Sequence, residues 1–156
     1  MDYLEVWRIT DKKFKNSAFS GEGARLWGGR FNSPGKKAVY TSGSLSLALL
    51  ETLVQSNDRS NLEEKVLIRA TITEEIIHMP PKSELPEKWA LTPVSKASQR
   101  YGDDWITKNK HAVLKVPSVV VPIEFNYVIN PNHPHFNRIT ITNPELISID
   151  PRLWET

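Results

Sequence analysis

Eleven prolines lie between residues 34 and 151 of this 156-residue chain, ten of them from residue 80 onward, where they limit the length of the elements that it can form. Proline lacks a backbone N–H and fixes φ, so it ends helices and is confined to the ends and edges of sheets. The long helices of a bundle do not fit this pattern, which favours many short elements joined by firm corners. A chain of this length buries enough apolar surface for one stable core. We therefore expect a single domain over residues 1–156.

The composition excludes several classes of protein. The chain has no cysteine, which rules out a disulfide framework, thiolate-bound zinc, iron–sulfur clusters and a thiol nucleophile. Twenty basic residues against eighteen acidic ones give a formal charge of +2, too small for a broad field that attracts nucleic acid or anionic lipid. No apolar run is long enough to span a bilayer, and the first residues do not resemble an export signal. We expect a cytoplasmic protein with no direct nucleic-acid or membrane partner.

Hydrophobic periodicity predicts an α+β domain with twisted mixed or antiparallel sheets and flanking helices. The strongest helical pattern covers residues 44–57, where Ser44 can cap the N-terminus and leucines fill one broad arc. A second helix is expected over 93–108, with an interruption near Gly102. Strand patterns cover residues 3–9, 38–41, 65–72, 76–79, 112–121, 125–129, 138–142 and 147–150. Pro117 lies within one of them, so it belongs at an edge or a bulge.

Residues 20–35 hold five of the seven glycines. This stretch is too rich in glycine for a helix and too aromatic for a linker, so we expect an ordered loop. Arg30 follows two glycines, which would let an anionic ligand approach its guanidinium, a group that binds phosphate oxygens in pairs. The alternative is an arginine that holds its own loop, and the residues alone favour that alternative. Trp27 is the one tryptophan of the chain that we expect to face a pocket.

Three further polar residues stand in apolar surroundings. Tyr40 ends a short strand pattern, where its ring can either pack in the core or stack on a heteroaromatic ligand. Glu51 lies at the edge of the apolar arc of the 44–57 helix, at the margin between core and cavity. Ser118 follows Pro117 in an apolar run, so a buried hydroxyl there must bond the backbone or a ligand. No histidine stands at a base spacing, so we do not interpret Ser118 as an acyl-transfer nucleophile.

The usual fingerprints of metals and nucleotide cofactors are missing from the sequence. Gly21-Glu22-Gly23 lacks the preceding strand and the third glycine of a dinucleotide fold, and there is no P-loop. His133 and His135 form a close pair, but a proline separates them and no carboxylate is near. We therefore predict neither a metal site nor a bound cofactor.

Taken together, the sequence blocks resemble the RES domain family of toxins. The matching blocks run in order along nearly the whole chain, at residues 7–9, 23–24, 28–35, 38–41, 47–51, 114–118, 121–127, 130–131 and 150–153. The arginine, glutamate and serine that give the family its name correspond to Arg30, Glu51 and Ser118. Two positions depart from the family pattern: Phe31 replaces a tryptophan, and Gln55 stands where we expect a histidine.

The resemblance implies a fold similar to that of ADP-ribosyltransferase toxins and a place in an Xre–RES toxin–antitoxin pair. Toxins of this family deplete cellular NAD by cleaving the nicotinamide–ribose bond, by hydrolysis or phosphorolysis, and some transfer ADP-ribose-derived groups to a protein. The antitoxin, an Xre-type protein with a helix-turn-helix region, blocks the toxin's pocket. NAD is then a substrate, and a homodimer or a symmetric toxin–antitoxin assembly fits this family.

The resemblance also implies roles for individual residues. Arg30 would hold the pyrophosphate, and Tyr40 would stack on nicotinamide or bind the adjacent ribose. Glu51 would stabilise the oxocarbenium character that develops when the bond breaks, as in glycoside cleavage. The residues expected in catalysis are Arg30, Tyr40, Glu51 and Ser118, and those expected to bind NAD are Arg30, Tyr40, Ser118, Trp27 and Asn32. Arg8 is either a second phosphate-binding cation or part of an internal ion pair.

Two other functions remain open at this point. A ribonuclease-type toxin would need a basic track, and the short lysine runs at residues 12–15 and 36–37 are weak support for one. A binding module that has kept the fold without the activity would bind NAD unchanged.

Overall fold

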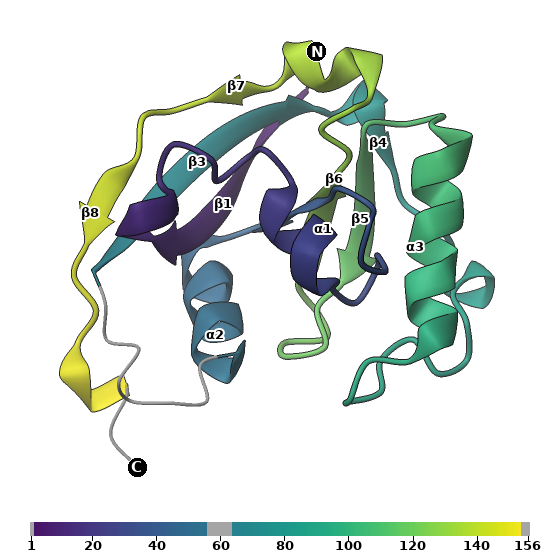
Figure 1. Ribbon diagram of the computed structural model, residues 1–156, viewed down its shortest axis with the longest axis horizontal. Coiled ribbons are helices and arrows are strands. Elements are labelled where there is room, and N and C mark those ends of the chain that lie inside the picture. The colour runs from purple at the N-terminus through teal and green to yellow at the C-terminus, as the bar shows by residue number, and fades with distance from the viewer. Residues whose placement is uncertain (1, 56–63, 154–156) are drawn as a thin grey trace.

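The computed structural model describes residues 2–55 and 64–153, and within them eight strands form one sheet (Figure 1). The strands are β1 (Tyr3–Asp11), β2 (Val39–Ser42), β3 (Lys65–Thr73), β4 (Ile77–His78), β5 (Val113–Pro117), β6 (Phe125–Ile129), β7 (Thr140–Ile141) and β8 (Glu145–Ile147). The helices are α1 (Glu22–Trp27), α2 (Leu45–Gln55) and α3 (Lys96–Lys108). Short 3-10 helices are η1 (Lys12–Phe14), η3 (Glu74–Ile76), η4 (Lys82–Glu84), η5 (Pro134–Arg138) and η6 (Pro151–Leu153). The α+β class predicted from the sequence is confirmed.

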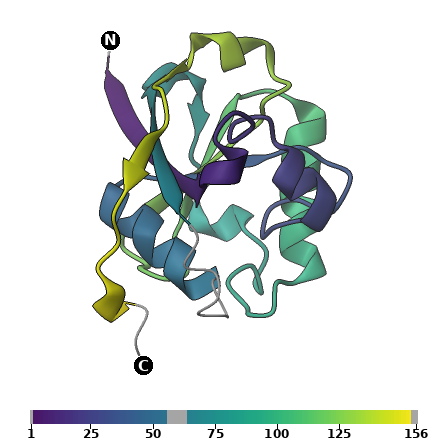
Figure 2. The ribbon, with the colours of Figure 1, turned by 60° about the vertical axis from the view of Figure 1, so that its left-hand side comes forward.

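The sheet runs in the order β4-β5-β6-β2-β1-β3-β7, and β8 also pairs with β3, alongside which it runs in Figure 2. All pairs are antiparallel except β4 with β5. The longest ladder joins β1 to β3, from Tyr3 opposite Thr73 to Asp11 opposite Lys65. The order also places β6, β2 and β1 side by side, although they come from opposite halves of the sequence. These three strands form the floor on which the site described below is built.

Buried apolar side chains cover both faces of the central strands. One cluster contains Val6, Val39, Ala70, Val113 and Ile129, and another contains Phe31, Trp105, Leu114, Val116 and Val128. Neighbouring residues of a strand point to opposite faces, so β5 and β6 contribute to both clusters. Burying one such side chain contributes about 1.5–3 kcal/mol, which accounts for the near-continuous apolar runs in these strands.

Helix α2 confirms the strongest helical pattern of the sequence. The Ser44 Oγ accepts a hydrogen bond from the Leu47 N–H at 3.1 Å, which is the predicted N-terminal cap. Leu47 and Ala48 are buried against β1 and β2. The helix ends at Gln55, and the predicted extension to residue 57 lies outside the described residues. No helix within residues 2–55 and 64–153 is long and apolar enough to cross a bilayer.

The glycine-rich segment, residues 20–35, is not the continuous loop that its composition predicts. Residues Glu22–Trp27 form helix α1, which lies in front of the central strands (Figure 1). Its glycines stand mainly at its ends: Gly21 and Gly28 have φ of 81° and 75°, conformations that favour glycine. Glycine content therefore marks the boundaries of α1 and does not prevent its formation.

Gly102 does not interrupt α3, which is continuous over Lys96–Lys108. A Cβ on Gly102 would lie 1.7 Å from the carbonyl oxygen of Phe31. The glycine therefore lets the backbone of the glycine-rich segment pack directly on the helix. The prediction was wrong because an isolated glycine in a helical pattern marks either a break or a close approach, and periodicity does not tell them apart.

Several predicted strands have different bounds in the structure. The 112–121 run ends as β5 at Pro117, and residues 118–124 form the turn into β6. Pro117 is neither at a bulge nor in an edge strand, but it lies beyond the two residues of β5 that pair with β4. The predictions for 76–79, 138–142 and 147–150 correspond to the short strands β4, β7 and β8, and β8 lies earlier than expected.

Candidate active site

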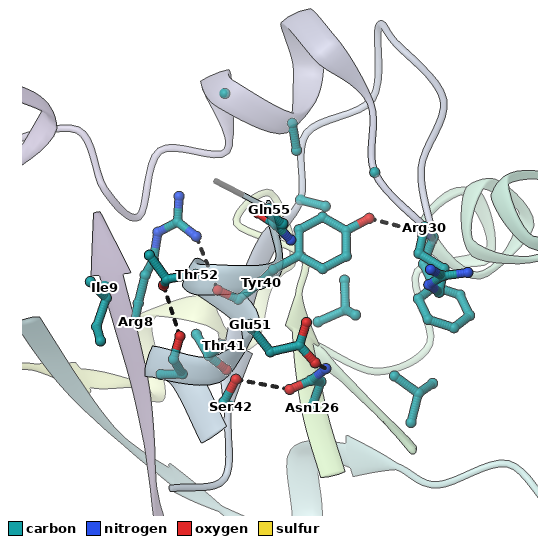
Figure 3. Close-up of a pocket in the computed structure, with 18 of the residues that line it drawn as sticks. Arg8, Ile9, Arg30, Tyr40, Thr41, Ser42, Glu51, Thr52, Gln55 and Asn126 are labelled. Carbon is teal, nitrogen blue, oxygen red and sulfur yellow. Dashed lines mark hydrogen bonds between the residues drawn. The ribbon is translucent and has the colours of Figure 1, made fainter. Parts of the chain in front are cut away.

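A cleft of about 500 Å³ opens between the glycine-rich segment, α2, strands β1 and β2, and the β5–β6 turn. Residues from these segments line it, including Arg8, Arg30, Tyr40 and Glu51. In Figure 3, Tyr40 and Glu51 lie between Arg8 and Arg30. Arg30 and Glu51, which were expected from the sequence to meet, therefore share one cleft.

Glu51 presents its carboxylate to the cleft from the last half of α2. Its Oε1 accepts hydrogen bonds from the Ser118 Oγ at 2.8 Å and from the Asn126 Nδ2 at 2.7 Å. Within the described residues no hydrogen bond uses its Oε2. One carboxylate oxygen is therefore held by the protein, and the other is left for a ligand.

Ser118 lies behind Glu51 and does not line the cleft. Its side chain is 1% exposed, and its Oγ donates to Glu51 while accepting from the N–H groups of Val120 and Val121, both at 3.0 Å. Of the two partners that the sequence left open for this hydroxyl, the structure shows the backbone, together with the Glu51 carboxylate. The hydroxyl thereby ties the β5–β6 turn to the carboxylate.

Asn126 is a site residue to which the sequence alone assigned no role. It lies on β6, opposite Ser42 of β2, and lines the cleft. Its Oδ1 accepts from the Ser42 Oγ at 2.8 Å, and its Nδ2 donates to Glu51. The available signal was a polar residue in the middle of an apolar strand, since such a residue needs a partner when it is buried.

Arg30 is half-buried at the opposite side of the cleft. Its Nη1 donates to the carbonyl oxygens of Trp89 and Leu91 at 2.9 and 2.7 Å. Burial lowers the pKa of Arg30, and the nearby charge of Glu51 partly offsets this effect. Within the described residues no hydrogen bond uses its Nε or Nη2. Arg30 thus anchors the segment around residue 90, which differs from the alternative in which it holds its own loop, and its binding of an anionic ligand stays a prediction.

Tyr40 forms the centre of the cleft floor and is held by the glycine-rich segment. Its hydroxyl donates to the Asn32 Oδ1 at 2.6 Å and accepts from the Phe31 N–H at 3.0 Å. Burial raises the pKa of Tyr40 well above its ordinary value, so the phenol stays protonated. A Cβ on Gly29 would lie 2.7 Å from the Tyr40 hydroxyl, so the glycine is needed for the ring to fit.

Arg8 is a second cation that lines the cleft, from β1. Its Nη1 donates to the Tyr40 carbonyl oxygen at 3.0 Å, while its buried Nε has no hydrogen-bond partner. Burial lowers the pKa of Arg8 to about 10, so it still carries its charge at neutral pH. None of the ion pairs found among residues 2–55 and 64–153 includes Arg8. The internal ion pair is therefore not found among the described residues, and phosphate binding by Arg8 stays a prediction.

Besides Ser118, two further residues expected to bind NAD do not line the cleft. Trp27 is 84% exposed at the end of α1, so the expectation that it faces the pocket was wrong. Asn32 is fully buried, and its Nδ2 donates to three backbone carbonyls, those of Ala24, Ser33 and Lys36. It holds the glycine-rich segment and orients the Tyr40 hydroxyl, which is an indirect role.

Histidines and carboxylates of the described residues meet in pairs, such as His78 with Glu84. No group of three or more such side chains among these residues is arranged to hold a metal ion. The rings of His133 and His135 lie 5.1 Å apart, but the His133 Nδ1 accepts from the His135 N–H. His133 therefore caps η5, and its Nδ1 is already occupied by a backbone N–H.

The arrangement combines two cations, one carboxylate and an aromatic floor. Guanidinium donors bind phosphate oxygens, and the stem of a dinucleotide carries a negatively charged pyrophosphate. A carboxylate with one free oxygen can bind a ribose hydroxyl or stabilise a cation that develops on the sugar. The cleft can therefore hold a phosphate-bearing ligand at its arginines and a hydroxyl or a developing positive charge at Glu51.

Comparisons of this chain with known proteins agree on one family. The profile of the RES domain family matches residues 5–150. A protein named Toxin Res from Yersinia enterocolitica is 34% identical over 96% of this chain and 99% of its own length. A Toxin Res from Photorhabdus laumondii is 36% identical over 95% and 96%. A Prs ADP-ribosylating toxin from a Sphingobium species is 34% identical over 94% of each chain.

A solved structure supports the fold. A chain in the crystal structure of the MbcT–MbcA toxin–antitoxin complex of M. tuberculosis superposes with a TM-score of 0.75. The alignment covers 99% of this chain and 88% of that chain, at 16% sequence identity. At this identity the likeness concerns the fold alone.

Proposed function

Because the chain belongs to the RES domain family, we propose that it is the toxin of a toxin–antitoxin system and that it consumes NAD. The proposed reaction breaks the bond between nicotinamide and ribose. The observation that carries this proposal is the shared cleft of Arg8, Arg30 and Glu51.

The two arginines of the cleft would bind the negatively charged pyrophosphate. Arg30 keeps its Nε and Nη2 for this purpose, and Arg8 contributes a charge with no acidic partner among the described residues. Two fixed guanidinium groups would hold the dinucleotide at its centre and so position the sugar relative to Glu51. Such positioning lowers the entropic part of the barrier.

Glu51 would act on the nicotinamide ribose through its free Oε2. When the C–N bond breaks, its electron pair moves to the positively charged ring nitrogen, and nicotinamide leaves as a neutral molecule. Positive charge then develops on the ribose carbon and ring oxygen. A carboxylate fixed beside that charge stabilises the transition state more than the ground state, which is the condition for faster turnover.

The acceptor that completes the reaction is water, phosphate or a nucleophile of a protein. Each adds its electron pair to the ribose carbon, and water or a protein nucleophile then loses a proton. A relative named as a Prs ADP-ribosylating toxin favours transfer to a protein as the second candidate function.

Incubation of the purified chain with NAD tests this proposal directly. We expect nicotinamide release, and the mass of the other product identifies the acceptor: ADP-ribose for water, its phosphorylated form for phosphate, or a labelled protein in lysate. Glu51→Gln keeps the shape and the hydrogen-bond acceptor but removes the charge, so it should release nicotinamide roughly 10²- to 10³-fold more slowly. Glu145→Gln on β8 is the matched control and should retain full activity.

Other results would contradict the proposal. NAD that stays intact in buffer, with phosphate and in lysate would refute the enzymatic function. NAD that binds without change would favour a binding module, and degradation of RNA without NAD would favour a ribonuclease.

The proposed partner is an Xre-type antitoxin that covers the cleft. The solved structure with the same fold is that of a toxin–antitoxin complex, which supports a protein partner. Co-expression with such an antitoxin should suppress NAD loss in cells. If NAD is lost at the same rate with and without the bound antitoxin, the antitoxin does not act at the cleft.

A further inference from the structure

Asn126 contacts the proposed catalytic carboxylate, and nothing in the proposed reaction requires it. It is the middle residue in a chain of side chains that runs from Ser42 on β2 through Asn126 on β6 to Glu51 on α2 (Figure 3). Three separate elements are thus linked to one carboxylate oxygen.

The chemistry of the three groups fixes the direction of each hydrogen bond. An ionised carboxylate only accepts, so the amide of Asn126 must turn its NH₂ group to Glu51. Its carbonyl oxygen then faces Ser42, whose hydroxyl donates at 2.8 Å. Ser42 is 4% exposed, so water has little access to compete for this contact.

The two oxygens of the Glu51 carboxylate therefore differ in their hydrogen bonds. Asn126 and Ser118 both donate to Oε1, at 2.7 and 2.8 Å, and both therefore hold the carboxylate in one rotamer. In this rotamer Oε2 has no hydrogen-bond partner among the described residues. Without Asn126 the carboxylate would keep only one donor and could rotate about its last bond.

We propose that Asn126 is a positioning residue, which fixes the ionised Glu51 carboxylate with its Oε2 toward the substrate. Ser42 serves the same end by orienting the Asn126 amide. The kinetic part of this inference rests on the proposed function, while the contact itself can be tested without substrate.

A double-mutant cycle on stability tests the contact. Asn126→Asp is nearly isosteric and places a second negative charge beside Glu51, so it should lower the melting temperature at pH 7 by roughly 5 °C. In the Glu51→Gln background the same substitution should cost little, because the glutamine amide can donate to the new carboxylate. Asn137→Asp on η5 is the matched control and should leave the melting temperature unchanged in both backgrounds.

A kinetic test separates positioning from a structural role. Asn126→Ala should lower kcat roughly 10-fold and change KM less than about 2-fold, because the oriented carboxylate acts in the transition state. Asn126→Asp should move the acidic limb of the pH–rate profile upward by roughly 1 unit or more, since a like charge favours protonation of the pair. A purely structural asparagine would change stability without moving this limb.

The two proposals fail in different ways. If Asn126→Asp costs the same stability with Glu51 and with Gln at position 51, Asn126 does not act on the carboxylate and the inference is overturned. An unshifted pH profile in an active Asn126→Asp variant overturns it as well. If the unsubstituted chain does not turn over NAD but the cycle shows coupling, the proposed function fails and the contact stands.

Discussion

The cations and the carboxylate of the cleft hold their charges in different ways. Arg8 and Arg30, which lie on either side of Glu51 in Figure 3, donate to backbone carbonyls, and no acidic side chain of the described residues forms an ion pair with them. Glu51 accepts from the neutral side chains of Ser118 and Asn126. In both cases the partners are uncharged, so the net charge of each group is kept for a ligand.

This difference shows where the molecule gives up stability for binding. A buried cation without a counter-charge is costly, and the pKa of Arg8, lowered to about 10, reflects that cost. The hydrogen-bonded Glu51 carries less of this burden because two donors replace part of its hydration. Substitutions of the arginines and of Glu51 should therefore have different effects on NAD turnover and on stability.

The largest expected effect is the loss of the carboxylate. Glu51→Gln should lower kcat for NAD roughly 10²- to 10³-fold, the range seen when one electrostatic stabiliser of a transition state is removed. KM should change little, because the pyrophosphate contacts remain. Steady-state kinetics of nicotinamide release checks this. A larger change in KM than in kcat would move Glu51 from catalysis to binding.

The next effect concerns the contact between α3 and the glycine-rich segment that carries Arg30. Gly102→Ala would place a Cβ against the Phe31 carbonyl oxygen, where neither backbone can move easily. We expect the free energy of unfolding to fall by about 3 kcal/mol, since this exceeds the small gain in helix propensity. Denaturant unfolding measures it. A stabilised Gly102→Ala variant would show that α3 and the glycine-rich segment pack less closely than described.

Arg8→Met should change the binding of NAD without a large change in stability. Removal of this buried cation should raise KM for NAD roughly 10- to 50-fold by loss of a phosphate contact. Stability should change by less than about 1 kcal/mol, because the lost hydrogen bond to Tyr40 is offset by relief of the desolvation cost. Kinetics and thermal unfolding of one preparation measure both. A strongly destabilised variant with normal KM would assign Arg8 to the core.

The smallest effect is expected at Trp27. Because this side chain is 84% exposed and does not line the cleft, Trp27→Ala should change kcat and KM for NAD less than about 2-fold. The same kinetic assay applies. A large rise in KM would show that the cleft extends over the end of α1 when NAD is bound.

The sequence predicted the elements whose pattern is local. Helix α2 follows from its leucine arc and the Ser44 cap, and strands β1, β3 and β6 follow from β-branched and aromatic runs. Helix α1 was missed because glycine suppresses the helical signal, although here the glycines mark its ends. The strand over 112–121 was too long because valines 119–121 belong to a turn whose apolar side chains partly line the cleft.

The candidate site was predicted in its residue types more than in its contacts. Arg30, Tyr40 and Glu51 line the cleft, as expected for a shared site. Asn32 and Ser118 are fully engaged with the residues that line it, a distinction between direct and indirect contact that no linear pattern carries. Whether Arg8 forms an internal ion pair depends on which groups surround it in three dimensions, and a linear pattern does not show them.

The residues that line the cleft run from Trp7 to Val128 and come from both halves of the chain. A nascent chain that has emerged from the ribosome only as far as α3 therefore still lacks β5 and β6, and with them the Ser118 and Asn126 donors that hold Glu51. We expect translation to expose no working toxin until the C-terminal part of the polypeptide is being made.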